Sequence, residues 1–208
     1  MRFALLLIGS ILWAEDVVIV GARIADGTGA PLRVGNVRFR HDTIVQVGAF
    51  APRKSDQVIN GQGMVLAPGF IDPHNHSDRG LAQEPAAVSQ VSQGITTVLL
   101  GQDGGSALPL EPWFAGHRKA PSALNVASLA GHATIRRRVM GDDLKRVAKP
   151  EEVTAMAVLL EQAMKDGALG LSSGLEYEVG SYADTAEMIT LAKTEASVKS
   201  ASSRKCET

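Results

Sequence analysis

Two histidines that stand one residue apart, His74 and His76, are the residues best placed to do chemistry in this sequence. They follow the apolar run 69–72, and side chains two positions apart on a strand point to the same face of a sheet. Their nitrogens can therefore bind one metal ion. Asp72 falls on that face too, where its carboxylate can orient a ligating imidazole. A strand end with two solvated histidines is the alternative, but the apolar run and the aspartate favour a metal.

A third candidate ligand follows the next apolar run, residues 95–100. The glycine-rich segment 101–106 contains Asp103, whose carboxylate can join the two histidines in a His₂-carboxylate set with open positions. Such a set suits zinc or another divalent ion. Two alternatives stay open. Asp103 caps the next helix or forms an Asx turn, or the loop binds phosphate, which ranks lower because the loop lacks the residues of a P-loop.

Other polar residues follow the third and fourth apolar runs. His132 is interpreted as a metal ligand, as a substrate contact or as a histidine that supports the ligands from behind, and the supporting role is preferred. Tyr177 either points its hydroxyl at a substrate or packs beneath its own loop. His41 and His117 are interpreted as surface residues. Cys206 is the only cysteine, which excludes a zinc site built on cysteines and an intramolecular disulfide.

The elements that must position these residues change character after Leu66. Residues 15–66 are typical of a small all-β module, because short apolar or alternating runs are separated by glycine-rich turns. After Pro68, apolar strands alternate with amphipathic helices, which indicates βαβ units and a parallel sheet. The strands are expected at 17–24, 34–40, 43–47, 57–59, 69–72, 95–100, 125–130 and 168–171, and the helices at 85–93, 110–117, 151–165 and 185–193.

Four βα units over residues 67–193 match an α/β fold, the first half of a (β/α)8 barrel whose active site lies at the carboxyl ends of its strands. A full barrel needs about 250 residues, more than follow Leu66 in this sequence. Residues 194–208 are rich in Ser, Lys and Ala and are predicted to be a disordered tail. The arginines at 136–138 are predicted to form a solvated helix face.

Composition and the amino-terminal residues narrow the class of protein. The formal net charge is −1, with 21 Lys and Arg against 22 Asp and Glu, so neither nucleic acid nor a membrane surface is an expected partner. Residues 1–14 have a positive start and an apolar stretch that is too short to span a bilayer. We predict a cleavable signal peptide and export to the periplasm or the cell exterior. A buried first strand is the alternative.

Four motifs taken together resemble the amidohydrolase superfamily and, within it, the N-acyl-D-amino-acid deacylases (D-aminoacylases). They are Pro-Gly-Phe-Ile-Asp-x-His-x-His at 68–76, Gly-Ile-Thr-Thr-Val at 94–98, Gly-His-x-Thr-x-Arg at 131–136, and the segment 167–177. The resemblance covers residues 16–193. The Gly-Thr-Gly at 27–29 is similar to the opening of the β-sandwich in these enzymes, so the all-β module is expected to be a β-sandwich.

The resemblance implies that one or two zinc ions activate water for attack on an amide carbonyl, which releases a carboxylic acid and a D-amino acid. His74 and His76 match the histidines of the family's first strand. Asp103 stands where many members carry a metal-bridging cysteine, and a carboxylate is a harder ligand than a thiolate. Tyr177 matches a family tyrosine associated with the substrate's carboxylate end. The implied partner is a small N-acyl amino acid.

The resemblance also implies residues that this sequence does not contain. In the family, two further histidines come from strands five and six, and the catalytic aspartate comes from strand eight. We therefore expect metal ligands but no catalytic residue in this chain, and no activity from these 208 residues. A non-catalytic product is one alternative reading. Another amidohydrolase, such as a cyclic-amide hydrolase, is a second.

Overall fold

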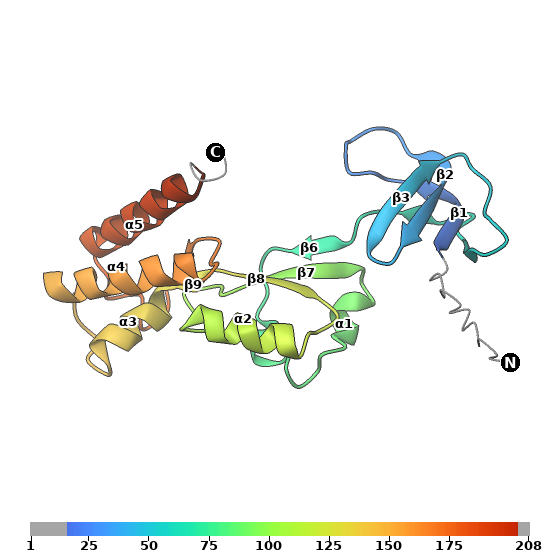
Figure 1. Cartoon of the computed structure of the whole chain (residues 1–208). Helices are drawn as coiled ribbons and strands as arrows, with labels where there is room; N and C mark the ends of the chain where they lie inside the picture. Colours follow the sequence, from blue (N-terminus) through green and yellow to red (C-terminus); the bar gives the residue numbers. More distant parts are fainter. Residues whose placement is uncertain (1–15, 204–208) are drawn as a thin grey trace, which may run out of the picture. The chain divides into compact units, whose positions relative to one another are not determined.

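The computed structural model describes residues 16–203, which form two compact units with a boundary between Pro68 and Gly69 (Figure 1). The boundary lies shortly after the change of pattern at Leu66. The predicted signal peptide at 1–14 and the last five residues lie outside the described part. Among the described helices, none is both long and apolar enough to cross a bilayer.

The first unit is a five-stranded sheet in the order β3-β2-β1-β4, with β5 also paired to β1. β1, β2 and β3 are antiparallel neighbours, whereas β4 and β5 run parallel to β1. All four strands expected here are confirmed, and their bounds agree within one residue. The strands are β1 Val17–Ile24, β2 Arg33–Arg40, β3 Thr43–Gly48, β4 Gln57–Asn60 and β5 Val65–Leu66.

Buried charge fixes the end of this sheet. The guanidinium of Arg40 donates two hydrogen bonds to the Asp16 carboxylate, at 2.9 and 3.0 Å. Arg38, almost fully buried, donates from Nη2 to Oδ2 of Asp56 at 2.5 Å. The hydrogen bond from Arg40 lowers the pKa of Asp16 against the opposing effect of desolvation. Since buried charges are tolerated only when paired, these pairs specify which strand ends meet.

The second unit carries the alternating strands and helices. β6, β7 and β8 form one parallel sheet, and β9 pairs in parallel with β10. The backbone links the two, because Leu129 N–H donates to Leu100 O and Leu169 N–H donates to Ser128 O, both at 2.9 Å. The elements are β6 Phe70–Asp72, the 3₁₀ turn η1 Ser77–Arg79, α1 Val88–Val91, β7 Ile95–Leu100, α2 Leu110–Lys119, β8 Asn125–Ser128, β9 Ala130–Gly131, α3 His132–Met140, α4 Pro150–Lys165, β10 Leu171–Ser172 and α5 Thr185–Ser203.

Two apolar clusters hold this unit together. One gathers buried side chains from α2 to α5, and α4 packs on both α3 and α5 (Figure 1). The apolar stripe expected for residues 151–165 supplies Met156 and Leu160, both fully buried. The other cluster joins Val98 and Leu100 of β7 to Leu81, Ala87 and Leu124. The clusters fix the strand ends from which the polar loops project.

Several expectations for this unit need correction. The third strand is split into β8 and β9, the fourth is reduced to β10, and the first expected helix shrinks to α1. The prediction of a disordered tail is wrong for residues 194–203, which continue α5. That stretch has no proline or glycine to end the helix, and Lys199 pairs with Glu195 one turn earlier at 2.6 Å.

The prediction that residues 136–138 form a solvated arginine face is also wrong in part. Residues 132–140 form α3, so the arginines do lie on a helix, although no helix was expected over this whole range. Arg137 and Arg138 are exposed, but Arg136 is fully buried. Arg136 lies one turn after His132 on the same face of α3, and a carboxylate from α5 neutralises its charge, as described below. A partner 51 residues away leaves no local pattern in the sequence.

The start of α4 depends on an ion pair that responds to pH. Glu152 accepts hydrogen bonds from Nη2 and Nη1 of Arg146 at 2.6 and 2.7 Å, and from the Lys149 backbone N–H at 2.7 Å. The Arg146 bonds, followed by the Lys149 bond, lower the pKa of Glu152 from 4.5 to about 2. The folded state therefore binds the proton of Glu152 less readily than the unfolded state.

We expect the contribution of Glu152 to be complete above pH 4.5 and to be lost as the pH falls towards about 2, because a lowered pKa favours the folded state only while the carboxylate is ionised. Glu152→Gln should lower the urea midpoint at pH 7, and the difference from the parent should vanish near pH 2. The exposed neighbour Glu151→Gln controls for the loss of one charge. An equal effect of both substitutions would contradict the assignment.

Candidate metal centre

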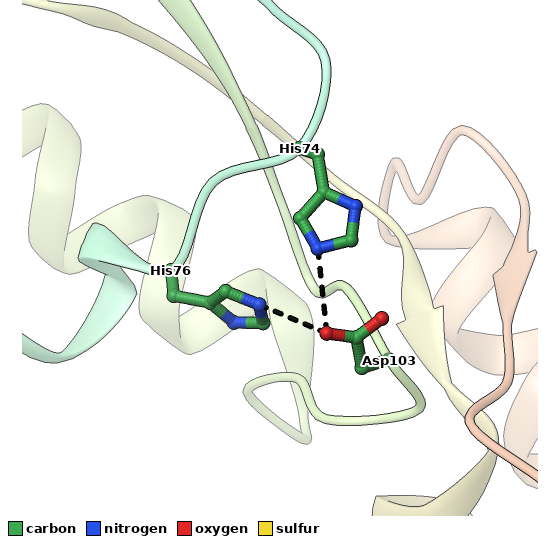
Figure 2. A group of neighbouring side chains, drawn as sticks. All are labelled: His74, His76 and Asp103. Carbon is green, nitrogen blue, oxygen red and sulfur yellow. Dashed lines mark hydrogen bonds and ion pairs between the residues drawn. The ribbon is translucent and has the colours of Figure 1, made fainter. Parts of the chain in front are cut away.

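The two histidines lie just beyond β6, in the segment that leads to η1. They are not part of the strand, so the shared face of a strand is not what brings them together. Instead, the segment folds so that both Nε2 atoms approach one carboxylate oxygen of Asp103 (Figure 2). The distance to Oδ2 is 3.3 Å from His74 Nε2 and 3.0 Å from His76 Nε2. The three predicted ligands therefore converge on one point.

The histidine segment is bent by a short chain of side-chain hydrogen bonds. Asp72 accepts the His74 backbone N–H at 3.2 Å and the Asn75 side-chain amide at 2.7 Å. Asn75 Oδ1 in turn accepts the Ser77 N–H at 2.9 Å. These bonds, that from Asn75 first, lower the pKa of Asp72 and keep it ionised. The role predicted for Asp72 is corrected: it orients the backbone that carries the ligands, because it accepts from a backbone N–H and from a side-chain amide rather than from an imidazole ring.

Both ligand segments are attached to the carboxyl end of β7. Asn75 N–H donates to Leu99 O at 3.2 Å. The side-chain amide of Gln102 donates to Pro73 O at 2.8 Å and to Leu99 O at 3.2 Å. Gln102 thus ties the histidine segment to the loop that contains Asp103. This role was not predicted, although the position of Gln102 directly beside a candidate ligand was a signal.

Asp103 adopts a left-handed conformation with φ +55°, which is uncommon for a residue other than glycine. Its neighbour Gly104 is also left-handed, with φ +79°. The alternative in which Asp103 caps α2 is excluded, because Pro109 is the N-cap of that helix and no side chain caps it. The carboxylate is directed at the histidines instead.

The spacing of the three ligand atoms fits a bound metal. All three lie within 4.8 Å of one another. Two ligand atoms of a tetrahedral zinc site, each about 2.0–2.1 Å from the metal, are about 3.3 Å apart. The distances of 3.0 and 3.3 Å from Asp103 Oδ2 are close to that spacing. Both imidazoles are more than half exposed and Asp103 is about one-third exposed, so a ligand can reach the set.

A cavity of about 580 Å³ lies beside the candidate ligands. Tyr177 lines it and is half exposed, so the structure places this predicted substrate residue in the same cavity as His76 and Asp103. The other lining side chains were not predicted from the sequence, and they come from η1, the loop after β7, α2 and α3. They include Asp78, Arg79, Gln102, Ser106, Trp113 and Thr134.

His132 does not reach this cavity. It is fully buried, and its Nε2 lies 2.7 Å from Oε1 of Glu187 in α5. The predicted substrate contact is therefore corrected to a buried contact between helices. His41 is exposed in the turn between β2 and β3, as expected. His117 is half-buried, and its ring stacks on Trp113 with centroids 5.7 Å apart.

Glu187 is a residue that the sequence analysis missed. Its two carboxylate oxygens bind His132 and Arg136, and all three side chains are fully buried. Burial by itself would raise the pKa of Glu187, but the hydrogen bonds from His132 and Arg136 lower it below the ordinary value. A signal was present, because Glu187 lies one turn before the buried Leu191 on a helix and so interrupts an apolar stripe with a charge.

Comparison with known proteins gives consistent relatives. Residues 57–199 match the model of an amidohydrolase family. The chain is 39% identical over 197 residues to the N-acyl-D-aspartate deacylase of Alcaligenes xylosoxydans xylosoxydans, covering 84% of this chain and 39% of that protein. It is 34% identical to the D-aminoacylase of the same organism, covering 86% and 41%. The chain thus spans about two fifths of the length of these relatives.

Solved structures give the same result. An N-acyl-D-glutamate deacylase from Bordetella bronchiseptica, complexed with zinc and a phosphonate that mimics the tetrahedral intermediate, matches with a TM-score of 0.84 and 33% identity. That match covers 88% of this chain and 43% of the other. A D-aminoacylase structure matches with a TM-score of 0.82 and 32% identity, over 89% and 44%. The matched residues and the α/β fold show that this chain belongs to the amidohydrolase family.

Proposed function

We propose that the protein is a zinc-dependent hydrolase of linear amides, of the N-acyl-D-amino-acid deacylase type. The observation that carries the proposal is the convergence of His74, His76 and Asp103 at the carboxyl ends of β6 and β7. Relatives support the substrate class, because those with the highest identities quoted above act on N-acyl-D-aspartate and other N-acyl-D-amino acids. A solved D-aminoacylase structure that matches this chain at 32% identity contains a binuclear metal centre.

In this proposal, the two imidazoles and the carboxylate hold zinc, and Gln102 keeps the two ligand segments at a fixed spacing. Bound zinc would supply a Lewis acid that polarises the amide carbonyl and lowers the pKa of water. Tyr177 lies in the adjoining cavity and is proposed to hydrogen-bond the carboxylate end of the substrate. A carboxylate at position 103 in place of a thiolate widens the choice of metal to harder divalent ions.

The proposal includes a fold. The second unit is the first half of a (β/α)8 barrel, in which β6, β7, β8–β9 and β10 are successive parallel strands. The first unit is one layer of a β-sandwich. A β-sandwich has a second layer that packs on the first. Several apolar side chains of this sheet are about half exposed or more, and exposed apolar surface supports such a contact. They include Val34, Ile44, Val47, Val58, Ile59 and Val65.

Two further parts of the proposal rest on the sequence. The apolar stretch after Arg2 supports export through a cleavable signal peptide, which sequencing the amino terminus of the secreted protein would test. The chain contains only the first part of the family's ligand set, so we expect no turnover by these 208 residues alone. Hydrolysis of an N-acyl-D-amino acid by the 208-residue chain in the presence of added zinc would contradict this expectation.

The metal centre is tested by titrating the chain with Co²⁺ and Zn²⁺. We expect His74→Ala, His76→Ala and Asp103→Ala each to weaken binding by at least about tenfold, because each removes one of few ligands. Asp103→Cys should restore a soft ligand and add a thiolate-to-cobalt absorption band. The exposed histidine of the first unit provides the control, since His41→Ala should bind metal like the parent. Equal binding by all variants would show that the site is misassigned.

The reaction is tested in a chimera in which this chain replaces the matching segment of the Alcaligenes N-acyl-D-aspartate deacylase. We expect zinc-dependent hydrolysis of N-acetyl-D-aspartate, little hydrolysis of its L-enantiomer, and loss of activity in the His74→Ala chimera. The measurement is release of the free amino acid. His41→Ala in the same chimera controls for the loss of a histidine outside the candidate metal centre and should keep the activity. Hydrolysis of hydantoins or dihydroorotate in preference to linear amides would replace the proposal with a cyclic-amide hydrolase.

A further inference from the structure

A buried charged cluster joins two helices of the second unit. Glu187 of α5 binds His132 through Oε1 and Arg136 through Oε2, and both partners belong to α3. Arg136 uses its second terminal nitrogen to donate to the carbonyl oxygens of Leu144 and Arg146. The three charged or titratable side chains are fully buried. This cluster therefore fixes how α3 lies against α5 and against the loop before α4.

Burying this cluster costs folding free energy unless all of its charges are paired. A buried carboxylate and a buried guanidinium are stable only while they neutralise each other, and removing one partner leaves the other charge uncompensated. Among residues 16–203, no hydrogen-bond partner is found for the Nδ1 of His132 or the Nε of Arg136, although both atoms are buried. An apolar set of side chains would pack the same space without this cost. Retention of a charged set here suggests that it specifies one arrangement of α3.

The amino-terminal end of α3 is bonded to the loop that carries Asp103. Thr134 N–H, which has no partner within its own helix, donates to Gly104 O at 3.0 Å. Ser106 N–H donates to Thr134 Oγ1 at 3.0 Å, and that hydroxyl donates to Ser106 O at 3.2 Å. Gly131 N–H donates to Ser106 Oγ at 2.9 Å. The loop 101–106 thus replaces a side-chain cap for α3.

The other side of the same loop is bonded to β10. Ser172, almost buried, accepts the Gly104 N–H at 3.2 Å and donates to Gly101 O. The contact with α3 is close, because a Cβ at Gly131 would lie 2.4 Å from Gly104 O. A shift of α3 therefore moves the loop directly. Asp103, held in a left-handed conformation between these attachments, keeps that conformation only while the loop is fixed.

We propose that Glu187 is a positioning residue for the metal centre, acting through His132 and Arg136 on α3 and through α3 on the loop of Asp103. This inference rests on the proposed function, because the geometry that Glu187 is proposed to maintain is that of the proposed metal ligands. Within the described part of the chain, the Glu187 carboxylate binds His132 and Arg136 and none of the three candidate ligands. It holds the helix whose first turn supports the left-handed aspartate, so that the carboxylate meets both histidines.

The test measures amide hydrogen exchange of Gly104, Ser106 and Thr134 in the metal-free chain, together with Co²⁺ affinity. In Glu187→Gln, the charge of Arg136 is uncompensated. Exchange at the loop amides should then rise, and Co²⁺ affinity should fall by about tenfold, as for other residues that support metal ligands. Glu187→Asp keeps the charge but retracts it by one methylene, so it should show the same changes to a smaller degree. This variant is measured in place of Glu187→Gln if the latter does not fold.

Leu160→Ala is the matched control, because Leu160 is fully buried in α4 and belongs to the same unit. Urea is used to bring parent and variants to equal global stability. Leu160→Ala should then leave the loop amides and the Co²⁺ affinity unchanged. Unchanged loop exchange in both Glu187 variants, or an equal effect of Leu160→Ala, would overturn the inference. Absence of metal binding by the parent would refute the metal centre, whereas the exchange data would still decide the role of Glu187.

Discussion

The site depends on one constrained loop. Residues 101–106 turn through a left-handed aspartate, and Asp103 meets both histidines from that conformation. The loop is held by backbone bonds to α3 on one side and by the Ser172 hydroxyl on the other. Because a left-handed aspartate costs free energy, the surrounding structure must determine it. The parallel strands supply the common edge, and the loop supplies the geometry.

Charge is distributed unequally in this architecture. In the candidate metal centre, the carboxylate and imidazoles are partly exposed and have open positions, as a binding site requires. In α3 and α5, the side chains of His132, Arg136 and Glu187 are fully buried and, within the described part of the chain, bind one another and backbone carbonyls. The first set is available to a ligand, whereas the second is not. Similar residue types thus serve binding in one place and rigidity in the other.

Much of the fold could be predicted from local pattern. The bounds of the four strands expected in the first unit agree within one residue, because alternation and glycine-rich turns are signals within a few residues of each other, whereas the two-residue strand β5 was not expected. The start of α4 was marked by its proline and two glutamates. A helix face was expected only at residues 136–138 and the full extent of α3 was missed, since its composition is polar and its partner Glu187 is distant in the sequence. The continuation of α5 was also missed, although the Lys199–Glu195 pair one turn apart is a local signal.

By itself, the sequence determined the ligand types and the order of the strands that bring them to one edge. His74, His76 and Asp103 follow successive parallel strands, and the carboxyl ends of such strands meet wherever the sheet forms. Only the tertiary structure decided the remaining roles. It moved the histidines out of the strand, turned Asp72 towards the backbone, and buried His132 against a carboxylate 55 residues away. Those outcomes depend on contacts between distant segments, and no local pattern of residues encodes a contact of that kind.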